Sequence, residues 1–344
     1  MKRRIFLLLL MLSFVFVSAC GKSGQDIELE LEQEQPIPTE PEPEEVFKYE
    51  APLTGLGTNQ KLPNRAVMVM MNNAPEARPQ SGLDQADVVY EVLAEGSITR
   101  FVGIYHSGQP KIIGPVRSIR PYYIDIGSGY DAIMVHAGGS PDALATMKHK
   151  RIAHLDEIYN AGGSFWRESF RKAPHNLYTD LDHIWKGANA LGFRKEAAVP
   201  YFSFKDSTEE ASGVSAEKID LNYSGGYRVA YEYDEQTQRY KRFTSGKPHT
   251  DLTTGDQLAV TNLLVITAKH RILDSEGRRA IDVYGPGVGY LFQHGKAQEI
   301  TWEHKNGMIR AYINGNEAQM YPGNTWVNIM PSAANQAEAI QFSE

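Results

Sequence analysis

Cysteine is almost absent from this chain of 344 residues, which contains only Cys20. A single cysteine cannot form an intramolecular disulfide, so a small scaffold held together by disulfides is excluded. The rest of the chain has no thiol that could act as a nucleophile. Cysteine-dependent catalysis in the folded part is therefore excluded as well.

Known catalytic and nucleotide-binding signatures are also missing. The sequence has neither a Gly-X-Ser-X-Gly elbow nor a His-Glu-X-X-His zinc motif. The glycine-rich loop 137–139 lacks the Lys-Ser/Thr of a Walker motif and the spacing of a dinucleotide fingerprint. The 10 histidines are scattered along the chain without metal-ligand spacing. We expect no metal ion and no cofactor.

Neither sign of charge dominates the chain strongly. It carries 35 basic and 42 acidic residues, which gives a formal net charge of -7. A net negative charge argues against sequence-blind binding of nucleic acid, so no nucleic-acid partner is expected. The apolar fraction of 42% is enough for a sizeable core, which excludes a fully disordered chain.

Long apolar runs are missing too, apart from one near the N-terminus. Three basic residues precede the apolar stretch 5–17, which is too short to span a membrane. Residues 1–19 are therefore typical of a signal peptide. The ending Val17-Ser18-Ala19-Cys20 resembles the bacterial lipobox, which implies that Cys20 is lipidated. The alternative is an ordinary secretory signal that happens to end in cysteine.

Lipidation at Cys20 would place the protein at the outer face of the cytoplasmic cell membrane. Two or three acyl chains, palmitate among them, would anchor it stably. Residues 20–50 follow as an acidic tether, with 10 acidic and 2 basic residues between positions 21 and 50. Such a segment cannot bury enough apolar surface to fold and repels itself, which predicts a disordered spacer. It could instead be an acidic ligand for a basic partner.

The remaining residues form a β-rich pattern with few helices. The N-terminal part, 51–200, has strand-like runs at 67–71, 87–95, 98–105 and 130–136. Helices are predicted to begin at Ser140 and near Asp180 because both residue types cap helices. The C-terminal part, 201–344, is nearly all strand. The two parts are either separate domains or one continuous fold.

Gly96-Ser97 is predicted to be a two-residue hairpin turn. Facing residues then place Leu93 opposite Arg100, and alternation places Glu91, Glu95 and Arg100 on one face of the sheet. This group is either a salt bridge on a solvated surface, which the pattern favours, or the polar floor of a cleft.

Other polar residues stand out in loops. Arg117 and Arg120 lie three residues apart between glycine and proline, and paired guanidinium groups suit carboxylate or phosphate. Local pairing with acidic residues would explain them equally well. His136 ends a strand before a helix start, an arrangement that suits an anion. His175 and Asn176 lie in a predicted loop, where an isolated histidine is more often structural than catalytic.

Several short motifs along residues 51–332 point to one family. They are Ala51-Pro52-Leu53-Thr54-Gly55-Leu56, Asn72-Asn73 with Ala77 to Leu83, Glu95 to Phe101, Gly114 to Ser118, Pro174-His175-Asn176 and Pro322 to Asn328. Together they resemble the YerB-like lipoproteins of Gram-positive bacteria, a domain of unknown function with an N-terminal and a C-terminal part. The resemblance implies an α+β fold, a β-rich layered sandwich of two sheets with helices packed on one side, a mixed sheet and few helices.

The resemblance implies no activity, but its motifs include most of the polar candidates. As ligand-binding residues we predict Asn73, Arg78, Arg100, Arg117, Arg120 and Asn176. The first hypothesis is a lipoprotein that binds a protein partner or an anionic component of the cell envelope. The alternative is a hydrolase or transferase acting on an anionic envelope substrate, with the catalytic candidates Glu95, His136 and His175. Convergence of these groups in one pocket would favour ligand binding or catalysis.

Overall fold

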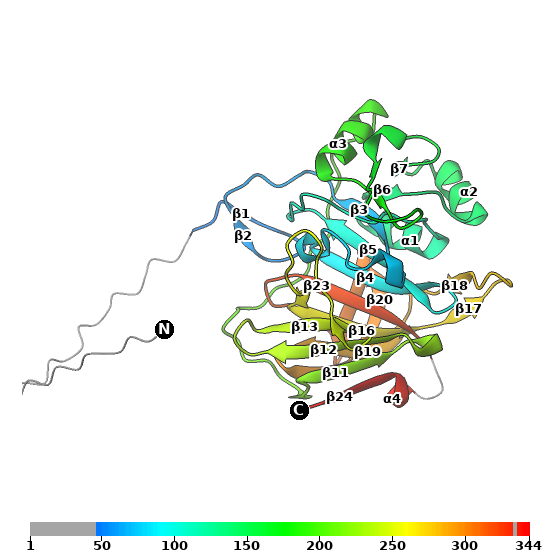
Figure 1. Cartoon of the computed structure of the whole chain (residues 1–344). Coiled ribbons are helices and arrows are strands. Elements are labelled where there is room, and N and C mark those ends of the chain that lie inside the picture. The colour runs from blue at the N-terminus through cyan, green and yellow to red at the C-terminus, as the bar shows by residue number, and fades with distance from the viewer. Residues whose placement is uncertain (1–45, 333–335) are drawn as a thin grey trace, which may run out of the picture. The chain divides into compact units, whose positions relative to one another are not determined.

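The structure is a computed structural model that describes residues 46–332 and 336–344 (Figure 1). The predicted signal peptide, Cys20 and most of the predicted tether lie outside the described residues. Within that tether, strand β1 (Tyr49–Glu50) pairs antiparallel with β2 (Gly57–Thr58). None of the helices in the described residues is long and apolar enough to cross a membrane.

A central sheet of 12 strands combines the N-terminal and C-terminal halves of the sequence. Strands β23 and β4 join the two halves, since they lie parallel and side by side. In spatial order the sheet contains β22 (Asn316–Glu317), β21 (Met308–Ile313), β20 (Lys296–Lys305), β19 (Gly287–Gln293), β16 (Asn262–Ala268), β23 (Thr325–Pro331), β4 (Val88–Glu95), β5 (Ile98–Tyr105), β3 (Val67–Asn72), β6 (Ile133–His136) and β7 (His154–Asp156), with β10 (Val214–Ser215) on β20.

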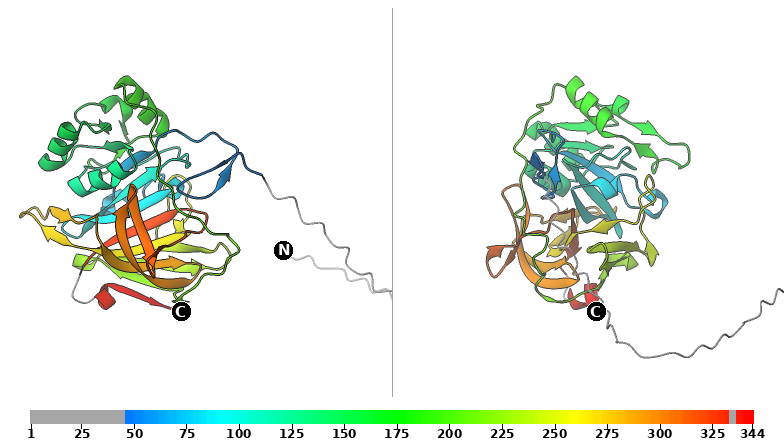
Figure 2. Two further views of the ribbon diagram at one scale, coloured as in Figure 1. Left: turned by 180° about the vertical axis from the view of Figure 1, so that it is seen from behind. Right: turned by 90° about the vertical axis from the view of Figure 1, so that its left-hand side faces the viewer.

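The sheet is mixed, as the family resemblance implied. Strand β23 lies between β16 and β4 and runs parallel to both. Strand β6 lies between β3 and β7 and also runs parallel to both. Every residue of β3 is buried, which confirms that its uninterrupted apolar run is covered on both faces. Figure 2 shows the C-terminal strands of this sheet, in orange, bending across the lower part of the molecule.

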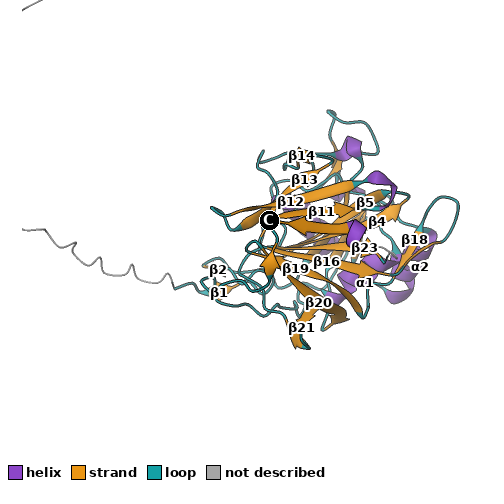
Figure 3. Cartoon of the chain, turned by 90° about the horizontal axis from the view of Figure 1, so that it is seen from below, coloured by secondary structure: helices purple, strands orange, loops and turns teal. Residues whose placement is uncertain are grey.

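A second sheet of six strands covers one face of the central sheet, and Figure 3 shows the two as adjacent layers. Its strands alternate buried and exposed residues, as expected where one face is packed and the other is wet. Tyr231 and Tyr240 pack there with Trp326 of the central sheet. The strands are β14 (Lys247–Pro248), β13 (Arg239–Thr244), β12 (Arg228–Asp234), β11 (Lys218–Asn222), β24 (Ile340–Ser343) and β15 (Ala259–Val260).

The three longer helices gather on the N-terminal half of the central sheet (Figures 1 and 2). Helices α1 (Pro121–Gly129) and α2 (Pro141–Lys150) share a core with Met68 and Met70, on the face away from the six-stranded sheet. Helix α3 (Leu181–Ala190) packs on the other face. The β-rich α+β fold with few helices is therefore confirmed.

Both expected helix starts are present, whereas α1 was not predicted. Ser140 and Asp180 accept hydrogen bonds from the backbone N–H groups of Ala143 and His183. Helix α1 follows Arg120, whose side chain makes no capping hydrogen bond, and its start is marked by Pro121 in the first turn instead. The shorter elements are η1 (Pro75–Ala77), η2 (Leu83–Gln85), η3 (Gly162–Ser164), η4 (Ser224–Gly226), α4 (Gln336–Ala339), β8 (Trp166–Arg167), β9 (Leu177–Tyr178), β17 (His270–Ile272) and β18 (Arg279–Ile281).

The hairpin β4–β5 has the predicted turn but not the predicted register. Gly96 has a φ of 56°, and Glu95 faces Ile98 as expected. The register then shifts at Ala94, so Leu93 faces Thr99 and Arg100 faces Val92. Such a bulge reverses which face the following side chains occupy.

The bulge separates the two glutamates, so the prediction that Glu91, Glu95 and Arg100 share a face was wrong. Glu91 lies with Leu93 and Phe101 on the side of the six-stranded sheet. Glu95 and Arg100 lie on the side of α1 and α2. The solvated-surface interpretation was wrong as well, because Glu91 is 0% exposed and Arg100 is 5% exposed.

Candidate functional site

Three guanidinium groups lie near the carboxylate of Glu95, and a fourth contacts the turn that follows it. We call Arg100, Arg117, Arg120 and Arg279 the arginine cluster. Glu95 ends β4 and Arg100 lies in β5, while Arg117 and Arg120 precede α1 and Arg279 begins β18. Arg100 Nη2 lies 2.7 Å from Glu95 Oε2, and Arg120 Nη2 pairs with Glu95 Oε1. Both carboxylate oxygens are thus held by arginines.

Backbone contacts bring these distant segments together. Arg100 Nη1 donates to the carbonyl of Ser118 at 2.9 Å, which joins β5 to the segment before α1. Arg279 Nη2 donates to the carbonyl of Gly96 at 2.6 Å, which joins β18 to the hairpin turn. The backbone N–H of Arg117 donates to Met70, at the end of β3. The arginine cluster therefore depends on tertiary contacts between four separate segments.

Positive charge in the arginine cluster exceeds the negative charge that it contains. Four guanidinium groups and the carboxylate of Glu95 leave three positive charges uncompensated within this group. Burial lowers the pKa of Arg117, and the neighbouring Arg100 lowers it further. Burial also lowers the pKa of Arg100. Both directions mean that the site disfavours its own positive charges and would gain from an added anion.

A cavity of about 260 Å³ adjoins the arginine cluster. Helices α1 and α2 both begin at it, and helix starts present unpaired backbone N–H groups and a positive dipole. The Nε atoms of Arg120 and Arg279 are buried and have no hydrogen-bond partner. The lining residues are Arg120, Pro121, Ser140, Pro141, Asp142, Leu273, Asp274, Arg278 and Arg279.

Two acidic residues also line this cavity and offset part of its charge. Asp274 is engaged with Arg278, whose Nε lies 2.6 Å from its Oδ2. Asp142 is exposed in the first turn of α2. Neither carboxylate forms a described ion pair with Arg120 or Arg279. The cavity therefore suits a small oxyanion, since guanidinium groups and helix starts bind phosphate or carboxylate.

Asn73 and Arg78 lie on the opposite face of the central sheet from the arginine cluster. Asn73 Nδ2 donates to Glu91 Oε1 at 3.1 Å and to Thr99 Oγ1 at 2.7 Å. Arg78 Nε donates to Asn73 Oδ1, and its guanidinium lies 5.0 Å from the centre of the Tyr227 ring. Both residues belong to a buried network, so the structure does not bring them into one site with Glu95.

The buried network is organised by an ion pair that sequence analysis missed. Arg242 Nη2 of β13 lies 2.7 Å from Glu91 Oε2 of β4, with side chains 1% and 0% exposed. Thr99 and Tyr227 hydroxyls donate to the other oxygen of Glu91. The pair joins the two sheets, and no local sequence signal could link residues 151 positions apart.

The two predicted catalytic histidines have separate surroundings. His175 Nδ1 accepts from Asn72 Nδ2 at 2.9 Å, and Asn72 faces Arg100 across the β3–β5 pair. His136 Nδ1 donates to the carbonyl of Gly138 at 2.9 Å. His136 therefore takes part in a hydrogen-bond group beside the arginine cluster and not in it.

Asn176 lies apart from the arginine cluster, in the segment between β8 and β9. Its Nδ2 donates to the carbonyl of Glu168 at 2.9 Å, and its Oδ1 accepts from Arg167 Nη1 at 3.1 Å. Both contacts are local, which fits a residue that shapes its own loop. Of the predicted site residues, the structure brings together Glu95, Arg100, Arg117 and Arg120.

His136, His154 and Asp156 form a group that could hold a metal ion, in the part of the chain that the structure describes. Sequence spacing did not indicate it because His136 and Asp156 lie on neighbouring parallel strands. The contact between the rings is close, with His136 Nε2 3.1 Å from His154 Nδ1.

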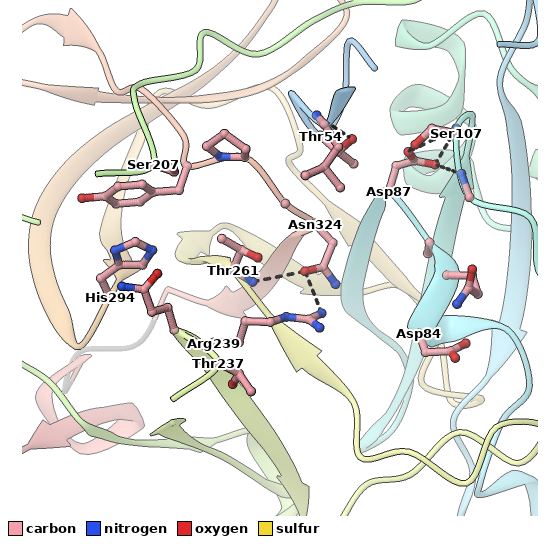
Figure 4. Close-up of a pocket in the computed structure, with 18 residues that line it drawn as sticks. Thr54, Asp84, Asp87, Ser107, Ser207, Thr237, Arg239, Thr261, His294 and Asn324 are labelled. Carbon is pink, nitrogen blue, oxygen red and sulfur yellow. Dashed lines mark hydrogen bonds between the residues drawn. The ribbon is translucent and has the colours of Figure 1, made fainter. Parts of the chain in front are cut away.

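A second and larger pocket of about 510 Å³ lies on another part of the molecule (Figure 4). Asn324 Oδ1 accepts from the backbone N–H of Thr261 at 3.1 Å and from Arg239 Nη2 at 3.2 Å. Asp84 and Asp87 lie across the pocket from His294 (Figure 4). This pocket also carries charges of both signs, with Asp84, Asp87 and Arg239 in its lining, and Arg239 Nε is buried without a hydrogen-bond partner.

None of the site residues predicted from the sequence lines this larger pocket. A usable signal was present, since Thr54 and the segment 322–324 belong to motifs quoted for the family resemblance and also line the pocket. These segments meet through a hydrogen bond from the N–H of Gly323 to the carbonyl of Thr54.

Comparison with known proteins identifies the family. Residues 53–194 match the N-terminal domain, and residues 219–327 the C-terminal domain, of a protein of unknown function, DUF3048. "Putative lipoprotein YerB" of Bacillus subtilis (strain 168) is 40% identical over 287 residues, which cover 83% of this chain and 87% of that protein. The chain belongs to the DUF3048 family. The predicted YerB-like resemblance is thus confirmed.

A solved structure supports the same DUF3048 fold. The crystal structure of YerB protein from Bacillus subtilis has a TM-score of 0.79 and 38% sequence identity, and it covers 86% of this chain and 100% of that chain. The family description names no activity, so the function has to be argued from the site.

Proposed function

We propose that this chain is a lipoprotein, anchored by Cys20 at the outer face of the cytoplasmic membrane, that binds an anionic component of the cell envelope at the arginine cluster. The observation that carries the proposal is the pair of buried, unpartnered Nε atoms of Arg120 and Arg279 beside the cavity. Buried donors normally have partners, so unpaired ones indicate a ligand that completes them. The lipoprotein part is supported by the lipobox and by the relative named as a lipoprotein.

Charge and shape favour an oxyanion as the ligand. Buried positive charges are costly unless they are paired, and two of the four arginines of the cluster, Arg117 and Arg279, form no described ion pair within it, while Arg100 and Arg120 share one carboxylate. A cavity of about 260 Å³ accommodates a phosphate or carboxylate group of a larger polymer. The starts of α1 and α2 add backbone N–H donors on the same side.

Binding is better supported than catalysis at this site. A general base needs a free lone pair near the substrate, and arginines hold both oxygens of Glu95. Burial lowers the pKa of His136 to about 4, which keeps its ring neutral, and both its nitrogens are engaged. The hydrolase or transferase alternative would have to depend on His175. A protein partner has less support than an oxyanion because the unpaired groups lie in a small cavity.

Calorimetry on the full chain in detergent tests the proposal. The probes are inorganic phosphate, a phosphodiester polymer and a carboxylate polysaccharide, which distinguish the two sources of oxyanion. We expect Arg279→Gln to weaken binding at least tenfold, and added salt to weaken it further. Arg194→Gln is the matched control, because that arginine is 59% exposed and pairs with Asp131.

Two results would overturn the proposal. One is that none of the three anions binds to the unmodified chain. The other is that Arg194→Gln weakens binding as much as Arg279→Gln, which would indicate general charge attraction. The thermal unfolding midpoint of each variant shows whether the fold is intact.

A further inference from the structure

Three potential metal ligands project from one face at the edge of the central sheet. His154 and Asp156 are two residues apart in β7, and alternate residues of a strand share a face. His136 of β6 is the register partner of Asp156 in a parallel pair, so its side chain lies on that face too. The ligand atoms of these three residues lie within 4.8 Å of one another.

The spacing of the two imidazoles suits a shared ion. His136 Nε2 lies 3.1 Å from His154 Nδ1. Two nitrogens bound at about 2.0–2.1 Å to a tetrahedral ion lie roughly 3.3 Å apart. A metal ion can therefore take the place of this hydrogen bond, with the proton of His154 Nδ1 transferred to Nε2 of the same ring so that both rings are neutral ligands.

The hydrogen bonds around His136 also prepare it as a ligand. His136 Nδ1 donates to the carbonyl of Gly138 at 2.9 Å, which leaves the lone pair on Nε2, the atom that faces His154. Histidine ligands are usually oriented in this way, with the second nitrogen donating to a carbonyl or a carboxylate.

Asp156 has a buried carboxylate oxygen without a hydrogen-bond partner, which points to a cation independently of the two histidines. Its side chain is 0% exposed, and Oδ1 accepts from the backbone N–H groups of Gly138 and Ile158. Its Oδ2 is buried without a hydrogen-bond partner and lies 3.6 Å from His136 Nδ1. A buried carboxylate oxygen without a partner is costly, and a cation beside it would remove that cost.

We propose that His136, His154 and Asp156 form a binding site for a divalent transition-metal ion of the zinc type. His136 Nε2 and His154 Nδ1 are the nitrogen ligands, and Asp156 Oδ2 rotates towards the ion to supply the carboxylate. Water fills the remaining position. Imidazole ligands favour such an ion over calcium or magnesium, which prefer oxygen. The half-buried His154 on edge strand β7 gives access from solvent.

The proposed metal site adjoins the arginine cluster but does not depend on its function. The N–H of Ala137 donates to the carbonyl of Arg117, and the N–H of Ile119 donates to Gly138. These bonds connect the loop after His136 to the segment that carries two cluster arginines. The two sites have no ligand residue in common, so anion binding and metal binding can be tested with separate variants.

The test uses the full chain in detergent, without a polyhistidine tag, after removal of metal with a chelator. It is titrated with Zn²⁺ by calorimetry and with Co²⁺ by visible absorption. We expect one ion per chain and the d–d bands of nitrogen-ligated Co²⁺. His154→Ala should weaken Zn²⁺ binding at least a hundredfold, and Asp156→Asn tenfold to a hundredfold.

His183→Ala is the matched control, since His183 also pairs with an aspartate, Asp180, but is 45% exposed and distant in sequence. That variant should bind Zn²⁺ like the unmodified chain. Zn²⁺ should also raise the unfolding midpoint of the unmodified chain and not that of His154→Ala. Failure of the unmodified chain to bind one ion, or unchanged binding by His154→Ala, would overturn the proposal.

Discussion

Strand β4 carries two glutamates that differ in burial and in the balance of charge around them, since the side chain of Glu91 is 0% exposed and that of Glu95 is 26% exposed. Glu91 meets the charge of Arg242, and its other oxygen accepts from the hydroxyls of Thr99 and Tyr227. Glu95 meets the arginine cluster, where four positive charges face one negative charge. The ion pair of Glu91 and Arg242, which we call the balanced group, joins the two layers on one face of the sheet. Glu95 with the arginine cluster, which we call the unbalanced group, lies on the other face and retains unpaired donors.

This difference gives a criterion for distinguishing structural from functional polar clusters in this fold, namely whether buried donors lack partners. A cluster in which every buried polar group has a partner gains no hydrogen bonds when a ligand binds. A cluster with unpaired buried donors gains hydrogen bonds from a ligand that accepts from them. By that criterion the network of Glu91 is structural. The arginine cluster, with its adjoining cavity, is the binding site that we propose.

The largest expected effect comes from breaking the balanced group. Arg242→Met leaves Glu91 buried without a countercharge, so we expect the free energy of unfolding to fall by about 3–5 kcal/mol. Urea denaturation measures this loss. The double variant Glu91→Gln, Arg242→Met should recover part of it, because no buried charge is left. A loss below about 1 kcal/mol for Arg242→Met would contradict the structural role.

Removing Arg100, a buried member of the unbalanced group, should lower the free energy of unfolding by less than Arg242→Met does. Arg100→Ala loses a hydrogen bond to Ser118 and the ion pair with Glu95, but it also relieves repulsion from Arg117 and Arg120. We expect a loss of about 2 kcal/mol in the free energy of unfolding. A loss as large as that of Arg242→Met would show that the two groups do not differ as argued.

Acid should weaken the fold through His270, which lies beside Arg279. Burial, and then the charge of Arg279, lowers the pKa of His270 to about 4, against about 6.5 in the unfolded chain. The unfolded chain therefore takes up the proton first, so this stability is complete above about pH 6.5 and is lost as the pH falls towards 4. The contribution is about 1–3 kcal/mol.

The His270 prediction is checked by urea denaturation at a series of pH values. His270→Leu should show a shallower loss of stability between pH 6.5 and pH 4 than the unmodified chain. Added phosphate should reduce the loss in the unmodified chain, because a bound anion favours protonated His270 next to Arg279. An unchanged slope in His270→Leu would refute the assignment.

The smallest expected effect on the fold comes from Cys20→Ser. The variant should move from the membrane fraction to the soluble fraction, since a lipid anchor cannot form on serine. Both glutamate groups lie in residues 46–344, so the urea midpoint of that folded part should not change. Fractionation and denaturation of the same preparation check both statements. Continued tight membrane retention would contradict lipidation at Cys20.

Local patterns predicted much of the fold correctly. The apolar run of β3, the turn at Gly96, and the starts of α2 and α3 follow from alternation, turn chemistry and capping, which act over a few residues. Helix α1 was missed because Arg120 is not a capping residue and the prediction did not use Pro121 in the first turn as a start signal. Its apolar residues form a helix there because they pack against the central sheet.

The candidate site was predictable only in part. Four of its members, Glu95, Arg100, Arg117 and Arg120, come from neighbouring segments with recognisable motifs. Arg279 was not predicted, because its contact with Gly96 joins residues 183 positions apart. His154 and Asp156 were missed for a similar reason, since they meet His136 only through the pairing of β6 with β7.

The family, the lipobox, the β-rich class and the ends of many elements could be predicted from the amino-acid sequence, because these features depend on residues close together in the chain. Which charged groups lie together could be seen only from the folded structure. The extra residue at Ala94 turns Glu95 to the face opposite Glu91, and contacts between distant segments supply Arg242 to one glutamate and Arg279 to the surroundings of the other. Charge balance is a property of the folded neighbourhood, because burial and distance set both the cost of each charge and its partners.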